Sequence, residues 1–173
     1  MATDLIIRNA RLLGGGALAD IAIEGSVFGR IAPNLRQRAT REMDAAGRLV
    51  TPPLIDCHVH LDAVLTEGQP RHNQTGTLIE GIQIWSERKP SLTVEDIKRR
   101  ALQAIQWEVA QGTLFIRSHV DICDPSLTAL RALIELRDEV RDICELQLVA
   151  FPQDGILSFP NGRELMDEAL RLG

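Results

Sequence analysis

The sequence predicts an α/β fold in which parallel strands alternate with helices, preceded by a small region of short strands. From residue 54 onward, strand-like and helix-like segments alternate three times, an order typical of parallel βαβ units. The first 50 residues instead contain short apolar and alternating stretches, and Pro52 and Pro53 close this region. We therefore expect two domains, a small β domain at 1–50 and a region of βα units at 51–173.

Three short strands are predicted in the first domain, at residues 5–8, 20–24 and 27–31. The second of these alternates polar and apolar residues, which is the pattern of a half-buried strand. A turn centred on Gly25 leads into the third, which we interpret as its return strand. Glycines 14–16 predict a loop rather than a phosphate-binding motif, because no helix follows them and no G-x-G-x-x-G pattern is complete.

Three strands are predicted in the second domain, at residues 54–60, 113–120 and 145–151. The first is a short apolar segment that ends in histidines, and a long polar loop follows it up to about residue 77. The second contains the apolar run 114–116, so we expect it to be a buried strand.

Four helices complete this domain, at residues 78–88, 93–111, 125–140 and 161–172. The second has apolar residues at helical spacing, and Thr93 with Asp96 resembles a capping box at its start. We expect Pro125 to lie in the first turn of the third helix. Asn161 and Glu164 have the spacing of a capping box for the fourth.

Side chains able to bind a metal or a polar ligand stand at the ends of all three strands of the second domain. In a parallel barrel, the carboxyl ends of the strands meet on one face, and catalytic groups gather there. We therefore expect these side chains to share one site. The set comprises His58, His60, His119, Asp121, Gln153 and Asp154.

The pair His58 and His60 predicts a metal site. Residues two apart on a strand point to the same face of the sheet. Two neighbouring imidazoles can bind one divalent metal ion, and neutral imidazole suits zinc and iron. Taken alone, the pattern is equally compatible with two histidines in a polar barrel mouth.

Composition argues against several kinds of partner. The net charge is −5, so there is no basic excess to neutralise a phosphate backbone, and only 3% of residues are aromatic. We therefore expect no nucleic-acid partner. No apolar run of about 18 residues is present, so no membrane span is expected. Residues 1–4 lack a secretory pattern, and the three cysteines fit reduced thiols, which predicts a cytoplasmic protein.

Residues 54–62, which include the histidine pair, resemble the first-strand motif of the amidohydrolase superfamily. Further segments are similar to one of its families, the bacterial cytosine deaminases, so that the resemblance extends over residues 5–173. It implies the N-terminal part of a metal-dependent (β/α)8 barrel hydrolase, about three βα units, together with part of a small β-sandwich domain. The similar segments are residues 68–70, 73–82, 85–89, 117–121 and 150–158.

The resemblance implies a role for four residues. His58 and His60 match the two metal ligands of the first strand. Gln153 matches a glutamine that hydrogen-bonds the pyrimidine, and an amide can donate and accept at once. Leu78 matches a position that lines the substrate site.

His119 and Asp121 match residues on the barrel floor. We expect them to support the site from behind the ligands or to serve the fold. The implied cofactor is one divalent metal ion, Fe²⁺ or Zn²⁺, and the implied partner is a small-molecule pyrimidine.

The implied reaction is the hydrolytic deamination of cytosine to uracil and ammonia. Alternatives are a related enzyme acting on an s-triazine, isocytosine or creatinine, or a truncated relative without catalysis. In the family, the other metal ligands and the proton-shuttling carboxylate come from later strands. We therefore expect the barrel to be incomplete here, and expect a complementary C-terminal segment or a homo-oligomer to be needed.

Overall fold

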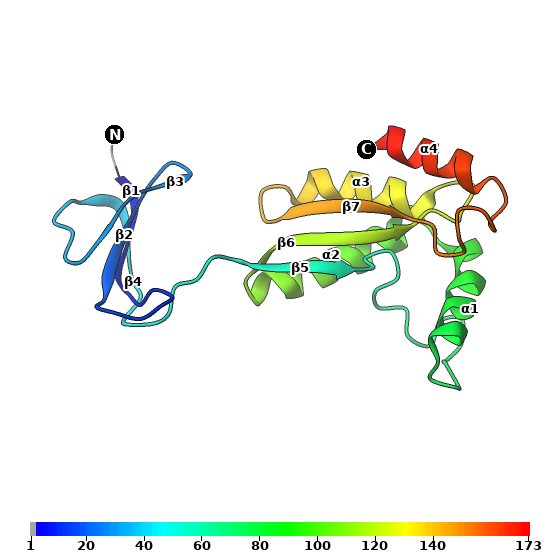
Figure 1. Ribbon diagram of the computed structural model, residues 1–173, viewed down its shortest axis with the longest axis horizontal. Coiled ribbons are helices and arrows are strands. Elements are labelled where there is room, and N and C mark those ends of the chain that lie inside the picture. Colours follow the sequence, from blue (N-terminus) through cyan, green and yellow to red (C-terminus); the bar gives the residue numbers. More distant parts are fainter. Residues whose placement is uncertain (1–2) are drawn as a thin grey trace. The chain divides into compact units, whose positions relative to one another are not determined.

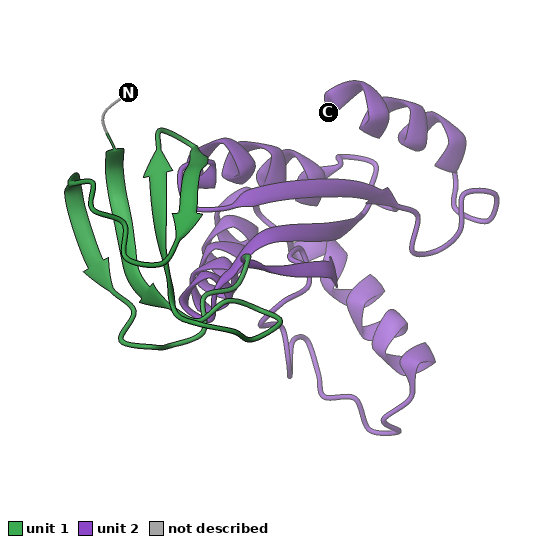
Figure 2. Ribbon diagram, turned by 60° about the vertical axis from the view of Figure 1, so that its left-hand side comes forward, with its two compact units in different colours: residues 1–52 green, residues 53–173 purple. Residues whose placement is uncertain are grey.

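The computed structural model describes residues 3–173. Met1 and Ala2, which belong to the segment 1–4 considered for a secretory signal, lie outside the described residues. The chain forms two compact units that meet in sequence between Pro52 and Pro53 (Figure 2). Each unit has a sheet of its own, four-stranded in the first and three-stranded in the second.

The sheet of the first unit has the order β3-β2-β1-β4. Neighbouring strands are antiparallel except β1 and β4, which are parallel. The sequence does not predict β4, because its residues are mostly polar and exposed and carry no alternation. The strands are β1 (Thr3–Ala10), β2 (Ala19–Glu24), β3 (Val27–Ala32) and β4 (Ala39–Asp44).

The core of the first unit is small and is supplemented by a partly buried ion pair between Arg8 and Asp20. Ile6, Ala22 and Leu35 form its buried apolar cluster. Asp20 is only 6% exposed and accepts hydrogen bonds at 3.0 Å from the Arg8 guanidinium and from the Leu35 backbone N–H. The buried carboxylate therefore holds a loop residue of the core against the sheet.

The second unit confirms the predicted alternation of strands and helices (Figure 1). Its three strands are parallel and lie in the order β5-β6-β7. No helix among residues 3–173 is long and apolar enough to cross a membrane. The elements are β5 (Leu54–Val59), α1 (Leu78–Arg88), η1 (Lys89–Ser91), α2 (Val94–Ala110), β6 (Thr113–Asp121), α3 (Thr128–Val140), β7 (Glu145–Phe151) and α4 (Gly162–Leu172).

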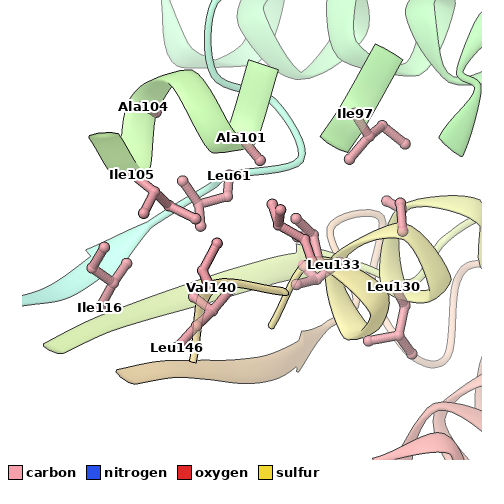
Figure 3. Close-up of a cluster of buried hydrophobic side chains, with 14 of the residues drawn as sticks. Leu61, Ile97, Ala101, Ala104, Ile105, Ile116, Leu130, Leu133, Val140 and Leu146 are labelled. Carbon is pink, nitrogen blue, oxygen red and sulfur yellow. The ribbon is translucent and has the colours of Figure 1, made fainter. Parts of the chain in front are cut away.

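Helices α2 and α3 bury one face of this sheet (Figure 3). Along β6, Ile116, Ser118 and Val120 are buried. Phe115, which points to the opposite face, is 43% exposed, and a hollow of about 780 Å³ lies over that face. The expectation that this strand is buried throughout is therefore wrong, since within residues 3–173 only one of its faces is covered.

The structure confirms the predicted start of α2 but not those of α3 and α4. The cap of α2 is confirmed, because Thr93 Oγ1 accepts a hydrogen bond from the backbone N–H of Asp96 at 3.1 Å. Helix α3 begins at Thr128, so Pro125 is not in its first turn. The reason is the Asp124 carboxylate, which accepts from the Thr128 N–H at 2.8 Å and closes a separate turn ahead of the helix.

The start of α4 also differs from the prediction. Asn161 has a left-handed backbone, with φ of 56°, and its side chain makes no capping hydrogen bond, so the capping box with Glu164 is wrong. The next residue must be small, because a Cβ on Gly162 would collide with the carbonyl oxygen of Ile156. The close approach of that loop therefore determines how this helix begins.

Truncation of a buried leucine tests the one-sided core. Leu133 on α3 is fully buried, whereas Leu170 on α4 is 69% exposed. We expect Leu133→Ala to lower the free energy of unfolding by about 2–5 kcal/mol, because it removes buried methyl groups and leaves a cavity. The matched variant Leu170→Ala should change it by less than about 0.5 kcal/mol. Urea unfolding measures both, and equal effects would contradict this description of the core.

Candidate active site

An irregularity at the end of β5 positions the first histidine. Asp56 and Val59 pair with Ile116 and Ser118 of β6, so β5 carries one extra residue between these two pairs. Such a β-bulge changes the direction of nearby side chains. The backbone N–H of His58 lies in the bulge and donates to Asp56 Oδ1 at 2.9 Å, so it is not left without a partner.

His58 and His60 direct their ring nitrogens at each other. Their Nε2 atoms are 3.4 Å apart. Two nitrogens bound to one zinc ion at about 2.0–2.1 Å and at a tetrahedral angle lie about 3.3–3.4 Å apart. Burial, and then the nearby imidazoles of His58 and His119, lower the pKa of His60. The neutral imidazole that a metal needs is therefore favoured, and the pair fits a metal ion.

His119 of β6 completes a cluster of three histidines but packs rather than converges. Its ring stacks on that of His58, with centroids 4.0 Å apart and an interplanar angle of 20°. Phe151 of β7 meets His60 edge-on, with centroids 5.3 Å apart. Residues 3–173 contain no group of three or more His, Cys, Asp or Glu side chains placed to hold a metal ion. Within this cluster, the two imidazoles whose nitrogens converge are therefore those of His58 and His60.

Asp121 is buried at the end of β6 and accepts four hydrogen bonds or ion-pair contacts. Its Oδ2 accepts from the Trp85 indole N–H at 2.9 Å and from the Lys89 ammonium at 3.0 Å. Its Oδ1 accepts from the backbone N–H groups of Cys123 at 2.8 Å and Gln153 at 3.4 Å. Asp121 therefore links helix α1 and the segment after it to the loop that follows β7.

Gln153 and Leu78, the two residues expected to meet substrate, have different surroundings. Gln153 is half-buried, and within the described part of the chain its side-chain amide forms no hydrogen bond, which leaves a donor and an acceptor for a ligand. Leu78 is the first residue of α1 and is 77% exposed.

The loop that precedes α1 is held by Glu80. This carboxylate accepts from the hydroxyl of Thr75 and from the guanidinium of Arg71, both at 2.6 Å. The hydrogen bond from the Thr75 hydroxyl is the main cause that lowers the pKa of Glu80 to about 2. The loop therefore has a defined conformation where it leads to Leu78.

Four residues of the site region lie in segments that resemble the family, but no role is predicted for them from the sequence. Phe151 ends an apolar strand, and Trp85 and Lys89 lie on or after a helix, so none carries a signal of its own. Asp62 stands two residues after His60, and its Oδ2 accepts from the Asp121 backbone N–H at 2.9 Å. Burial raises the pKa of Asp62 to about 7.

Replacement of either converging histidine tests the metal site. In a polypeptide that carries this chain with the rest of its barrel, His58→Ala or His60→Ala should weaken metal retention by more than about tenfold. Even the loss of a partner behind a ligand costs about 10–100-fold. Elemental analysis after dialysis measures the bound metal.

The loop histidine His72 supplies the matched control for this test. Its side chain is 70% exposed and its Nδ1 lies 2.9 Å from Glu67, away from the cluster. His72→Ala should therefore leave metal content unchanged. Full metal occupancy in both cluster variants would contradict the assignment of the ligands.

Comparison with known proteins identifies relatives that match nearly the whole chain. A 5-methylcytosine deaminase from Klebsiella pneumoniae, solved with 5-fluorocytosine, is 48% identical with a TM-score of 0.91, over 97% of this chain and 41% of that chain. An N-isopropylammelide isopropylaminohydrolase structure from Burkholderia multivorans is 31% identical with a TM-score of 0.82, over 100% and 43%. The N-isopropylammelide isopropyl amidohydrolase of Pseudomonas sp. (strain ADP) is 31% identical over 98% of this chain and 43% of its own length.

These relatives are longer than the chain, which spans between 41% and 43% of their length. The model of the amidohydrolase family matches residues 41–170, which is most of the chain. The similar structures confirm the predicted α/β fold as the N-terminal part of a (β/α)8 barrel. The chain therefore belongs to the amidohydrolase family.

Proposed function

We propose that this chain contributes the first three βα units of a metal-dependent deaminase that converts cytosine to uracil and ammonia. The observation that carries the proposal is the separation of 3.4 Å between the Nε2 atoms of His58 and His60 at the carboxyl end of β5. That end of a parallel strand is where barrel enzymes place catalytic groups. We further propose that the first unit is part of the small β-sandwich domain implied by the resemblance.

His58 and His60 are the proposed ligands of one divalent ion, Fe²⁺ or Zn²⁺. An ion bound there supplies activated water for hydrolysis. A catalytic site needs about three protein ligands, and residues 3–173 offer this pair alone. We therefore propose that further ligands and the proton-shuttling carboxylate are supplied by a complementary C-terminal segment or by another subunit.

Gln153 is the proposed contact to the pyrimidine. Its amide can donate one hydrogen bond and accept another, which matches a ring edge that carries both kinds of group. In the reaction, the bond from the ring carbon to the exocyclic nitrogen breaks, water supplies the new carbonyl oxygen, and ammonia leaves. Leu78 is proposed to line the substrate site. His119 and Asp121 are proposed to support it without touching the metal.

Similarity supports a cytosine-like substrate. The Klebsiella enzyme, which is 48% identical, is a 5-methylcytosine deaminase and was solved with 5-fluorocytosine. A second candidate is amine hydrolysis on an s-triazine, favoured by the 31% identity to the Pseudomonas N-isopropylammelide enzyme over 98% of this chain. Both reactions hydrolyse the bond between a ring carbon and an exocyclic nitrogen, so one metal ion bound by His58 and His60 would serve either.

A direct assay separates these candidates. The complete polypeptide with zinc or ferrous iron should release ammonia from cytosine faster than it releases amine from N-isopropylammelide. The segment 1–173 alone should release neither, because two imidazoles cannot complete the ligand set. Ammonia and amine release are measured on both proteins, and a chelator should abolish the activity of the complete form. Faster turnover of N-isopropylammelide would favour the second candidate over the first.

Removal of the Gln153 amide tests the substrate contact. In the complete polypeptide, Gln153→Ala should lower kcat/KM for cytosine roughly 5- to 150-fold and leave metal content unchanged. This corresponds to about 1–3 kcal/mol of lost transition-state stabilisation. Gln103, which is exposed on α2, supplies the control, and Gln103→Ala should have no effect. An unchanged kcat/KM in Gln153→Ala would show that this amide does not bind the ring.

A further inference from the structure

We infer that Lys89 is a positioning residue for Gln153. It joins the segment after α1 and the loop after β7 to the buried Asp121 at the end of β6. This inference rests on the proposed function, because it takes Gln153 as the contact to substrate. Lys89 itself need touch neither the metal nor the ring.

The inference starts from the two carboxylates that share the Lys89 ammonium. Lys89 Nζ lies 3.0 Å from Asp121 Oδ2 and 2.6 Å from Asp154 Oδ2. The side chains of Lys89, Asp121 and Asp154 are 10%, 3% and 28% exposed. Burial alone would lower the pKa of Lys89, but the two carboxylates outweigh it and raise that pKa. Lys89 is therefore a charged group enclosed by two partners.

The three charged groups come from three separate parts of the second unit. Lys89 begins η1, directly after α1, and Asp121 ends β6. Asp154 is the residue next to Gln153 in the loop after β7, 65 positions away from Lys89. The Phe159 ring, from the same loop, lies 5.6 Å from the Lys89 ammonium. The ammonium therefore connects the loop that carries Gln153 to η1 and to the end of β6.

Asp121 gives Gln153 a second point of attachment. Its Oδ1 accepts from the Gln153 backbone N–H at 3.4 Å, an N–H shared with the Phe151 carbonyl oxygen at 3.1 Å, while Oδ2 accepts from Lys89. The backbone of Gln153 is thus held by the carboxylate that Lys89 neutralises, and the neighbouring side chain is held by Lys89 itself. Without Lys89, the carboxylates of Asp121 and Asp154 would face each other unneutralised, and their repulsion would displace the loop.

Displacement of this loop should reduce substrate binding more than metal binding. The Gln153 amide is proposed to bind the ring in the ground state as well as in the transition state, and the loss of such binding raises KM more than it lowers kcat. The histidine pair stands on β5 and directly after it, and neither histidine contacts Lys89 through a hydrogen bond or ion pair of residues 3–173. The expected signature of lost positioning is therefore a raised KM with metal content preserved.

The chain offers a matched control for Lys89. The Lys98 ammonium on α2 also bridges two carboxylates, Glu135 at 3.1 Å and Glu139 at 2.6 Å, both on α3. This lysine has the same chemistry but joins two outer helices rather than two loops at the strand ends. Lys98→Met therefore reports the general cost of losing such a bridge.

The kinetic test uses the complete polypeptide. Lys89→Met should raise KM for cytosine by about tenfold, with kcat changed less and metal content unchanged. Lys98→Met should leave KM unchanged, and Lys89→Arg should restore most of the loss. In a Gln153→Ala background, Lys89→Met should add less than about a twofold change, because the positioned amide is already absent. An unchanged KM in folded Lys89→Met, or a full additional loss in the Gln153→Ala background, would overturn the inference.

Hydrogen exchange tests the same connection without activity. Lys89→Met should accelerate backbone exchange in residues 151–159 as well as in 85–93, whereas Lys98→Met should accelerate neither. Acceleration confined to 85–93 would overturn the inference. If Lys89→Met does not fold, Asp154→Asn removes one side of the bridge and should produce the same coupled acceleration at a smaller size. If the wild type does not act on cytosine, the proposed function fails, and this exchange result alone decides the role of Lys89.

Discussion

A buried carboxylate must be matched by donors, and Asp121 imposes this requirement at the centre of the second unit. It is 3% exposed and receives donors from helix α1, from η1, from its own turn and from the loop after β7. The neighbouring carboxylate Asp62 accepts the Asp121 backbone N–H, and burial raises the pKa of Asp62 to about 7. Segments distant in sequence thus meet at the strand ends because the fold cannot leave this charge unpaired.

The two faces of the parallel sheet divide stability and chemistry between them. The face covered by α2 and α3 holds the continuous apolar core, including Ile97, Ile116 and Leu133. The opposite face carries a hollow lined by polar and apolar side chains, and the histidine cluster stands at the carboxyl ends of its strands. Substitutions on the first face should therefore act on stability, while those at the strand ends should act on ligand binding.

Local patterns predicted most of the fold. The bounds of α1 and β7 agree with the predicted ranges, and α2 forms where apolar residues recur at helical spacing, which is a property of the segment itself. Strand β4 could not be predicted, since its polar residues form a strand only by pairing with β1. The starts of α3 and α4 differ because turns at Asp124 and Asn161, rather than the nearest capping residues, decide them.

In the candidate site too, the sequence predicted what depends on position along a strand and not what depends on contacts between distant segments. His58, His60, His119, Asp121 and Gln153 stand at strand ends, so a reading of strand order was sufficient to group them. The contacts that organise them were not predictable, because they form only after folding. Trp85 reaches Asp121 across 36 positions of the chain, and Lys89 reaches Asp154 across 65. The bulge that positions His58 likewise depends on the register between β5 and β6.

The convergence of His58 and His60 on a metal ion is the central claim of this account. Anomalous diffraction from crystals of the complete polypeptide, grown with zinc, tests it most directly. The account predicts a single strong anomalous peak at about 2.0–2.1 Å from the Nε2 atoms of both histidines. A metal peak elsewhere in the barrel, with neither Nε2 atom within bonding distance, would contradict it.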